Sequence, residues 1–158
     1  DRAADGPGYA MALPAWGPEP HPLPELAVAM GGPVEATLWR DKRYAVFVYP
    51  DAAAIRALSP DFATLATAGN VLYIATAPGD DCDVVSRVFA PAAGINEDPV
   101  TGSAHCVITP YWAQRLGRER FTAFQASARG GRLGCALEGD RVILTGQCVT
   151  VMQGLMHL

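Results

Sequence analysis

The sequence predicts an α+β fold in which strands surround one buried helix. Strand-like runs occur along most of the chain, and short helical segments interrupt them without a regular βαβ alternation. Residues 103–117 form a helical segment whose side chains are apolar on nearly every side. A helix without a polar face must be covered by other elements on all sides, so we place it at the centre of the domain.

The first half of the chain carries clear start and stop signals. Pro24 opens a helix that Gly31 closes, and a hairpin turns near Asp41. A further helix has Ser59 as its N-cap and Pro60 at its first position. The predicted elements are a strand (9–15), an extended proline-rich linker (16–24), a helix (24–30), a hairpin (34–50) and two helices (51–58 and 59–67).

The second half is mostly strands around the apolar helix. Pro110 lies inside this helix and has no N–H, so the carbonyl of Cys106 loses its helical hydrogen bond. Glycine-containing turns, such as the one at Gly139, separate the later strands. The predicted strands are 70–78, 83–91, 121–128, the hairpin 131–146 and a final strand 147–154.

Composition excludes several classes of protein. The chain has 158 residues, half of them hydrophobic and 18% charged, which is typical of one globular domain. A net charge of −4 argues against a nucleic-acid partner, because such partners need a concentrated basic surface. No apolar run approaches the roughly 18 residues of a membrane span, and no signal peptide is recognisable. We therefore expect a cytoplasmic protein without a membrane partner.

The four cysteines give no reason to expect a metal centre. They occur singly, without the paired spacing of tetrahedral metal sites. Reduced and mostly buried thiols are the simplest interpretation. A thiol enzyme that uses Cys106 is a weaker alternative, because no histidine and acid are arranged to activate it.

The stretch GINEDPVTGSAHC, residues 94–106, leads into the apolar helix and is the candidate site. A helix N-terminus presents unpaired N–H groups that bind anions. Gly102 lets the backbone approach a ligand closely, and Ser103 adds a hydroxyl group. The alternative is a self-sufficient cap in which Thr101 or Ser103 satisfies these N–H groups. Arg129 could reach the same pocket.

The titratable residues of this stretch have separate predicted roles. Pro99 favours extended backbone at Asp98, so the neighbouring side chains of Glu97 and Asp98 point to opposite faces. Asp98 is nearer the glycine–serine corner and is the candidate group for proton transfer, although it could simply form a turn. Glu97 is expected to be solvated or ion-paired. His105 is either a hydrogen-bonded core residue or a ligand contact.

The sequence resembles the C-terminal half of the PhzF-like family of phenazine-biosynthesis isomerases. The resemblance is carried by SRVFAPAAGINEDPVTGSAHCVITPYWAQRLG, QASARGGRLG and DRVILTGQCVTVMQG, and LSPDFATL and YAMALPA fit the same pattern. It implies a diaminopimelate-epimerase-like fold of two lobes. Each lobe is a curved, mostly antiparallel mixed sheet around a central helix, and the active site lies where the two helix N-termini face each other.

The resemblance also implies an activity and its residues. Family members isomerise without a cofactor or metal, by proton transfer on a small carboxylate-bearing substrate such as a dihydro-hydroxyanthranilate or an amino acid. The motif match assigns catalytic roles to Asp98 and Ser103. It assigns substrate binding to Gly102 and Ser103, whose N–H groups hold the substrate carboxylate, and to Thr101 and His105.

The resemblance leaves half of the active site outside the sequence. The family's principal general base is a glutamate of the N-terminal lobe. We therefore expect residues 1–18 to trail from a missing N-terminal lobe, 19–154 to form the C-terminal lobe and 155–158 to be a tail. The expected partners are the substrate, the missing lobe and a second copy in a homodimer, and the chain alone is expected to be inactive. The alternative is a non-catalytic anion-binding or assembly module.

Overall fold

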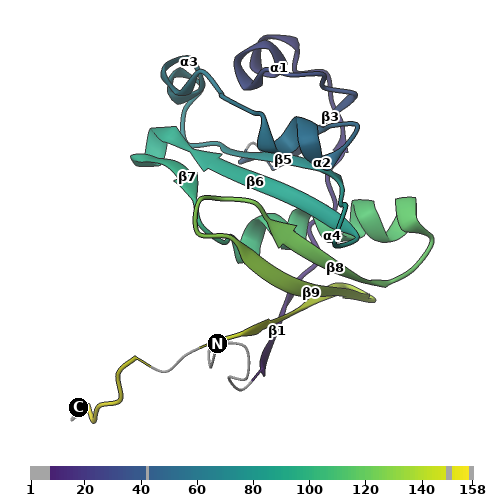
Figure 1. The fold of residues 1–158 in the computed structure, drawn as a ribbon, viewed down its shortest axis with the longest axis vertical. Coiled ribbons are helices and arrows are strands. Elements are labelled where there is room, and N and C mark those ends of the chain that lie inside the picture. The colour runs from purple at the N-terminus through teal and green to yellow at the C-terminus, as the bar shows by residue number, and fades with distance from the viewer. Residues whose placement is uncertain (1–7, 42, 149–150, 157–158) are drawn as a thin grey trace.

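The computed structural model describes residues 8–41, 43–148 and 151–156. Its strands form one mixed sheet in the order β1-β10-β9-β8-β6-β5-β4-β3-β2, with β7 also paired to β6 (Figure 1). The pairs β4–β5 and β6–β8 are parallel and the remaining pairs are antiparallel. The strands are β1 (Gly8–Pro14), β2 (Glu19–Pro20), β3 (Ala36–Arg40), β4 (Tyr44–Val48), β5 (Leu72–Pro78), β6 (Val84–Ala90), β7 (Ile95–Asp98), β8 (Arg120–Gln125), β9 (Gly131–Glu138) and β10 (Arg141–Gln147).

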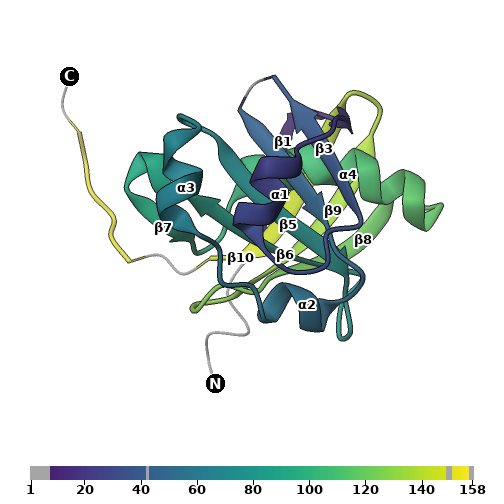
Figure 2. The same cartoon turned by 90° about the horizontal axis from the view of Figure 1, so that it is seen from above.

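The helices cover the two faces of this sheet differently. Three short helices lie on the outer face, and the long helix α4 lies on the inner face (Figures 1 and 2). Because α4 contacts β4, β9 and β10, which are far apart in the strand order, the sheet curves around it. The α+β class predicted from the sequence is confirmed. The helices are α1 (Pro24–Met30), α2 (Ala52–Arg56), α3 (Phe62–Thr67) and α4 (Gly102–Leu116), with a 3₁₀ turn at Pro91–Ala93.

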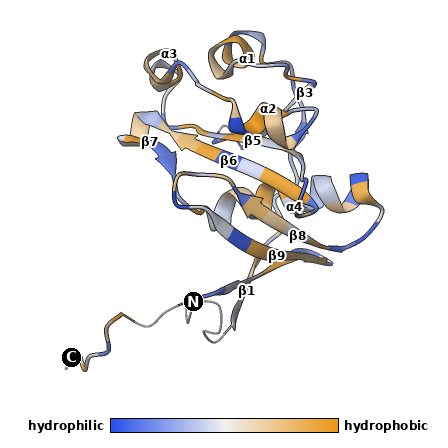
Figure 3. Cartoon of the chain, viewed as in Figure 1, coloured by the Kyte–Doolittle hydropathy of each residue, from blue (hydrophilic) through white to orange (hydrophobic). Residues whose placement is uncertain are grey.

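The central strands carry two hydrophobic cores because both of their faces are buried. In β4, Val46 points to the inner core around α4, whereas Phe47 points to the outer core under α1–α3. Tyr73 and Ile74 divide in the same way in β5. Strands buried on both faces have largely apolar sequences, and β6 is orange toward both of its ends in Figure 3.

Helix α4 is buried from Ala104 to Thr109 and runs without interruption through Pro110. The carbonyl of Cys106, which Pro110 leaves without a helical donor, accepts a hydrogen bond from the Trp16 N–H at 3.2 Å. Gly17 lies against the same proline, and a Cβ atom at this glycine would stand 3.4 Å from the Pro110 Cβ. The connection between β1 and α1 therefore docks on α4 where the proline frees a carbonyl group.

The N-cap predicted for the helix at 59–67 is wrong. The helix begins at Phe62, and Asp61 is its cap. The Asp61 carboxylate accepts hydrogen bonds from the N–H of Thr64 at 3.1 Å and from its hydroxyl at 2.6 Å. The Asp61 N–H also donates to the Ala29 carbonyl at 2.8 Å, and this hydrogen bond fixes the chain just before α3. A carboxylate that satisfies two donors outcompetes the Ser59 hydroxyl.

The predicted final strand at 147–154 is also wrong where the structure describes it. Gln147 ends β10, and Cys148 and residues 151–154 have no regular secondary structure, while residues 149 and 150 lie outside the described part of the chain. The pairing of β10 with β1 reaches Gly8, the first residue that the structure describes, and the pairing with β9 ends at Gly134. Within the described ranges, no helix is both long and apolar enough to cross a membrane.

Replacing a core residue of α4 tests the enclosure of this helix. Ile108 has no exposed surface, so Ile108→Ala should lower the free energy of unfolding by about 2–5 kcal/mol. Val28 on α1 is 83% exposed, and Val28→Ala should change it by less than about 0.5 kcal/mol. Urea unfolding followed by circular dichroism measures both. Equal losses for the two variants would contradict the placement of α4.

Candidate functional site

The loop Asp98–Thr101 joins β7 to the N-terminus of α4 and lies at the centre of the candidate site. Glu97 and Asp98 are extended, and their side chains have different partners. Glu97 forms a two-pronged ion pair with Arg87, with N–O distances of 2.7 and 2.9 Å. The Asp98 carboxylate instead accepts a hydrogen bond from the Thr101 hydroxyl through Oδ2. Only Asp98 therefore faces the start of the helix.

Side chains from β8 and its following loop hold the backbone of the 98–101 loop. Gln125 accepts from the Thr101 N–H through Oε1 at 2.8 Å and donates to the Asp98 carbonyl through Nε2 at 2.7 Å. The Ser127 hydroxyl donates to the Pro99 carbonyl at 2.7 Å. Neither Gln125 nor Ser127 was predicted from the sequence to be a site residue. Gln125 carried one usable signal, since it is a polar residue at an inward position of an otherwise apolar strand face.

His105 is a hydrogen-bonded core residue with no exposed surface. Its Nδ1 lies 2.8 Å from the Thr101 carbonyl and its Nε2 lies 3.4 Å from the Ser86 hydroxyl. Burial lowers the pKa of His105 below its usual value near 6.5 and outweighs the hydrogen bond to Thr101, which raises the pKa. A carbonyl can only accept, so the neutral ring carries its proton on Nδ1. Of the two interpretations of His105, this geometry supports the core residue, which reaches the site only through Thr101.

No described side chain caps the N-terminus of α4. The Thr101 side chain occupies the N-cap position, but its hydroxyl is used by Asp98 and not by the helix. The alternative in which Thr101 caps the helix is therefore not formed. The first-turn N–H groups at Gly102 and Ser103 have no intrahelical partner, because a helix leaves its first four donors unpaired.

Gly102 borders an open groove of about 1600 Å³ on the inner face of the sheet, whereas Asp98, Thr101 and Ser103 are not among its lining residues. Gly102 and Val100 contribute the helix end, and Arg129 adds a positive charge to the lining. Tyr9 and Met11 of β1 form part of the opposite wall and are 54% and 55% exposed. Positive charge and a helix N-terminus in one groove suit an anionic ligand.

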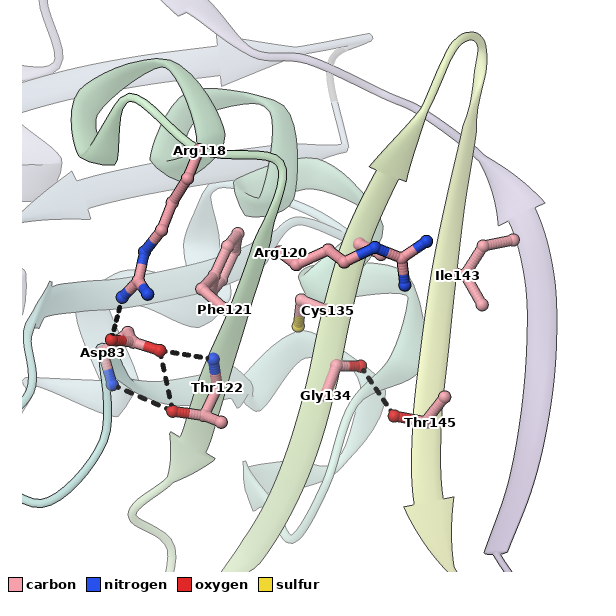
Figure 4. A pocket seen from close by; sticks show the side chains of 10 residues that line it. Asp83, Arg118, Arg120, Phe121, Thr122, Gly134, Cys135, Ile143 and Thr145 are labelled. Atoms are coloured by element: carbon pink, nitrogen blue, oxygen red, sulfur yellow. Dashed lines mark hydrogen bonds and ion pairs between the residues drawn. The ribbon is translucent and has the colours of Figure 1, made fainter.

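A smaller hollow of about 340 Å³ lies over β8–β10 and has a different character (Figure 4). Asp83 accepts from the Thr122 N–H at 2.7 Å and from its hydroxyl at 2.9 Å, and it is paired with Arg118. The Thr122 N–H is the main cause that keeps the pKa of Asp83 below its usual value. The acid of this hollow is thus fully engaged, and none of residues 94–106 lines it.

The buried thiols are not activated. Cys106 and Cys135 are in the inner core, and burial raises the pKa of Cys106 to about 11 and that of Cys135 to about 12. Neither forms an appreciable amount of thiolate near neutral pH, so the geometry gives no support to a thiol enzyme based on Cys106. Among the residues that the structure describes, no group of three His, Cys, Asp or Glu side chains could hold a metal ion.

Fold and site together define an α+β domain in which an acidic loop precedes the uncapped N-terminus of an enclosed helix. A family model described as phenazine biosynthesis-like protein matches residues 34–154. The chain belongs to this PhzF-like family.

Relatives support this membership at high identity. Two Pseudomonas aeruginosa proteins named as uncharacterized isomerases are 44% and 49% identical over 98% and 85% of this chain, which cover 59% and 51% of those proteins. A PhzF-family crystal structure from Enterococcus faecalis is 37% identical with a TM-score of 0.85 and covers 96% of this chain and 58% of that one. A PhzC/PhzF protein from Clostridium difficile is 32% identical with a TM-score of 0.82 over the same shares. The chain spans between half and three-fifths of these relatives.

The buried His105 predicts how stability depends on pH. An unfolded histidine takes up a proton as the pH falls through about 6.5, whereas folded His105 resists protonation. The unfolded state then binds more protons, so the free energy of unfolding should decrease between about pH 6.5 and 5, by at most about 1.4 kcal/mol per pH unit from this group.

Urea unfolding at several pH values measures this slope. His105→Asn removes the titrating ring and should flatten it, whereas His21→Asn replaces an exposed histidine and should retain it. An unchanged slope in His105→Asn would contradict the burial of a neutral imidazole.

Proposed function

We propose that this chain is part of a cofactor-independent isomerase that transfers protons on a small carboxylate-bearing substrate. One observation carries the proposal: Thr101 holds the Asp98 carboxylate beside the uncapped N-terminus of α4, and the first residue of that helix, Gly102, lines a groove together with Arg129. Relatives named as isomerases and membership of the PhzF-like family support the same reaction class.

The substrate carboxylate binds at the N–H groups of Gly102 and Ser103 in this proposal. The helix end has a positive partial charge of about 0.5, which stabilises an anion without another cation. Neutralising the carboxylate makes a neighbouring C–H bond more acidic, because negative charge developing on that carbon meets less repulsion. Asp98 then takes or returns the proton, and the Ser103 hydroxyl contacts the substrate.

A second lobe completes the cleft in this proposal. In line with the resemblance, the principal general base is proposed to be a glutamate on an N-terminal lobe of a diaminopimelate-epimerase-like fold. Residues 19–154 would then be the C-terminal lobe, 1–18 the end of the first lobe and 155–158 a tail. The half-exposed Tyr9 and Met11 support an additional cover for the groove, either that lobe or a second copy in a homodimer. This chain alone, with half of the acid–base pair, would be inactive.

Solvent exchange tests the proposal. We expect the full-length protein in deuterated water to place deuterium on carbon in a dihydro-hydroxyanthranilate or in one of a panel of amino acids, detected by mass spectrometry. Asp98→Asn should reduce the rate by at least about 100-fold, because general acid–base catalysis contributes this much. Asp140 on the β9–β10 turn is exposed, and Asp140→Asn should retain the full rate.

Two results would count against this function. Absence of exchange with every acid would leave binding or assembly as the role of the chain. Exchange that survives Asp98→Asn would remove this carboxylate from the chemistry.

A further inference from the structure

Gln125 is a buried amide whose surroundings demand hydrogen bonds. It ends β8, pairs in register with Ser86 of β6 and Gly131 of β9, and has no exposed surface. An amide buried without partners costs several kcal/mol on transfer scales, so each of its polar atoms must be satisfied. The partners of such a group show what it is used for.

The hydrogen bonds of this side chain go to the 98–101 loop. Oε1 accepts the Thr101 N–H at 2.8 Å, and Nε2 donates to the Asp98 carbonyl at 2.7 Å and to the Thr101 hydroxyl oxygen at 3.2 Å. One planar amide group thus forms hydrogen bonds with both ends of the loop. It fixes the separation between the backbone of Asp98 and that of Thr101.

These contacts allow only one orientation of the amide. Exchanging oxygen and nitrogen would place an NH₂ group against the Thr101 N–H and an oxygen against the Asp98 carbonyl, so that donors would face donors and acceptors acceptors. The orientation also directs the Thr101 proton. The hydroxyl oxygen accepts from Nε2, so its single hydrogen is left to donate to Oδ2 of Asp98.

We propose that Gln125 is a positioning residue that holds the Asp98 carboxylate beside the N-terminus of α4 through Thr101. Because Gln125 is fully buried, it acts through the loop and not by touching a ligand. With Oδ2 held by Thr101, Oδ1 is the oxygen left for proton transfer. The catalytic consequence rests on the proposed function, whereas the control of the loop does not.

Hydrogen exchange of the Thr101 amide in the full-length protein tests the control of the loop. Gln125→Met keeps the size of the side chain but removes the acceptor, and the Thr101 amide should exchange at least about 10-fold faster. Gln114→Met changes an exposed glutamine of α4, and Leu65→Ala destabilises the distant outer core. Both controls should leave Thr101 exchange slow. Wild-type exchange in Gln125→Met would overturn the proposal.

The rate of deuterium transfer tests the catalytic consequence with whichever panel acid the wild type exchanges. Gln125→Met should lower kcat by about 10–100-fold and change KM by less than about threefold, because a misaimed group slows chemistry more than binding. A faster Thr101 amide with an unchanged kcat would reduce Gln125 to a structural role. If the wild type exchanges no acid, the proposed function fails, and the Thr101 amide still decides whether Gln125 controls the loop.

Gln125→Glu separates the two halves of the amide. It keeps an acceptor for the Thr101 N–H, so exchange there should stay slow. Its second oxygen, however, replaces the donor and competes with Asp98 for the Thr101 proton. The kcat should fall and partly recover at low pH, where the introduced carboxyl group is protonated and donates again. A wild-type kcat and pH profile in this variant would contradict the role of Nε2.

Discussion

The enclosure of α4 is the constraint on which the rest of the structure depends. A helix whose side chains are apolar almost all round must be covered, and α4 is buried from Ala104 to Thr109 and again at Trp112 and Ala113, where the sheet curves around it from β4 to β10. Enclosure creates a difficulty at the helix ends, where backbone groups lack partners. At the C-terminal end Gly117 adopts a left-handed conformation and its N–H closes the last turn. At the N-terminal end no described side chain does the equivalent, and this is the end that meets the groove.

The two halves of the sheet have different roles: one contains the hydrophobic cores, and the other borders the groove. Strands β4–β6 are buried on both faces and hold two cores together. At the other end, β1 and β10 leave part of the inner face open, with Tyr9 and Met11 half exposed. An open apolar surface is tolerated at this end because strands β4–β6, which are buried on both faces, stabilise the fold. The acidic loop lies between the halves and takes its support from buried polar groups such as Gln125 and His105.

Much of the fold could be predicted from residues that are close together in the sequence. The features that were missed depend on residues that are far apart in the sequence. Helix α1 was predicted to the residue, because Pro24 and Gly31 mark its ends. The cap of α3 was misplaced because Ser59 and Asp61 are both good caps two residues apart, and tertiary contacts chose between them. In the site, the contact between Asp98 and Thr101 spans three residues, whereas Gln125 reaches the same loop from 24–27 positions away. No periodicity encodes such a distant partner.

The backbone hydrogen bond from the Trp16 N–H to the Cys106 carbonyl, which Pro110 leaves free, limits which residues position 16 can hold. It joins the connection after β1 to α4, whose first residue Gly102 lines the groove, and it uses no side-chain atom. The bond itself therefore forms with any residue at position 16 that has a backbone N–H, whereas the Trp16 side chain is constrained separately by its packing on the inner core and on Tyr44. Only proline at position 16 would break this hydrogen bond, because proline alone lacks the backbone N–H that donates it.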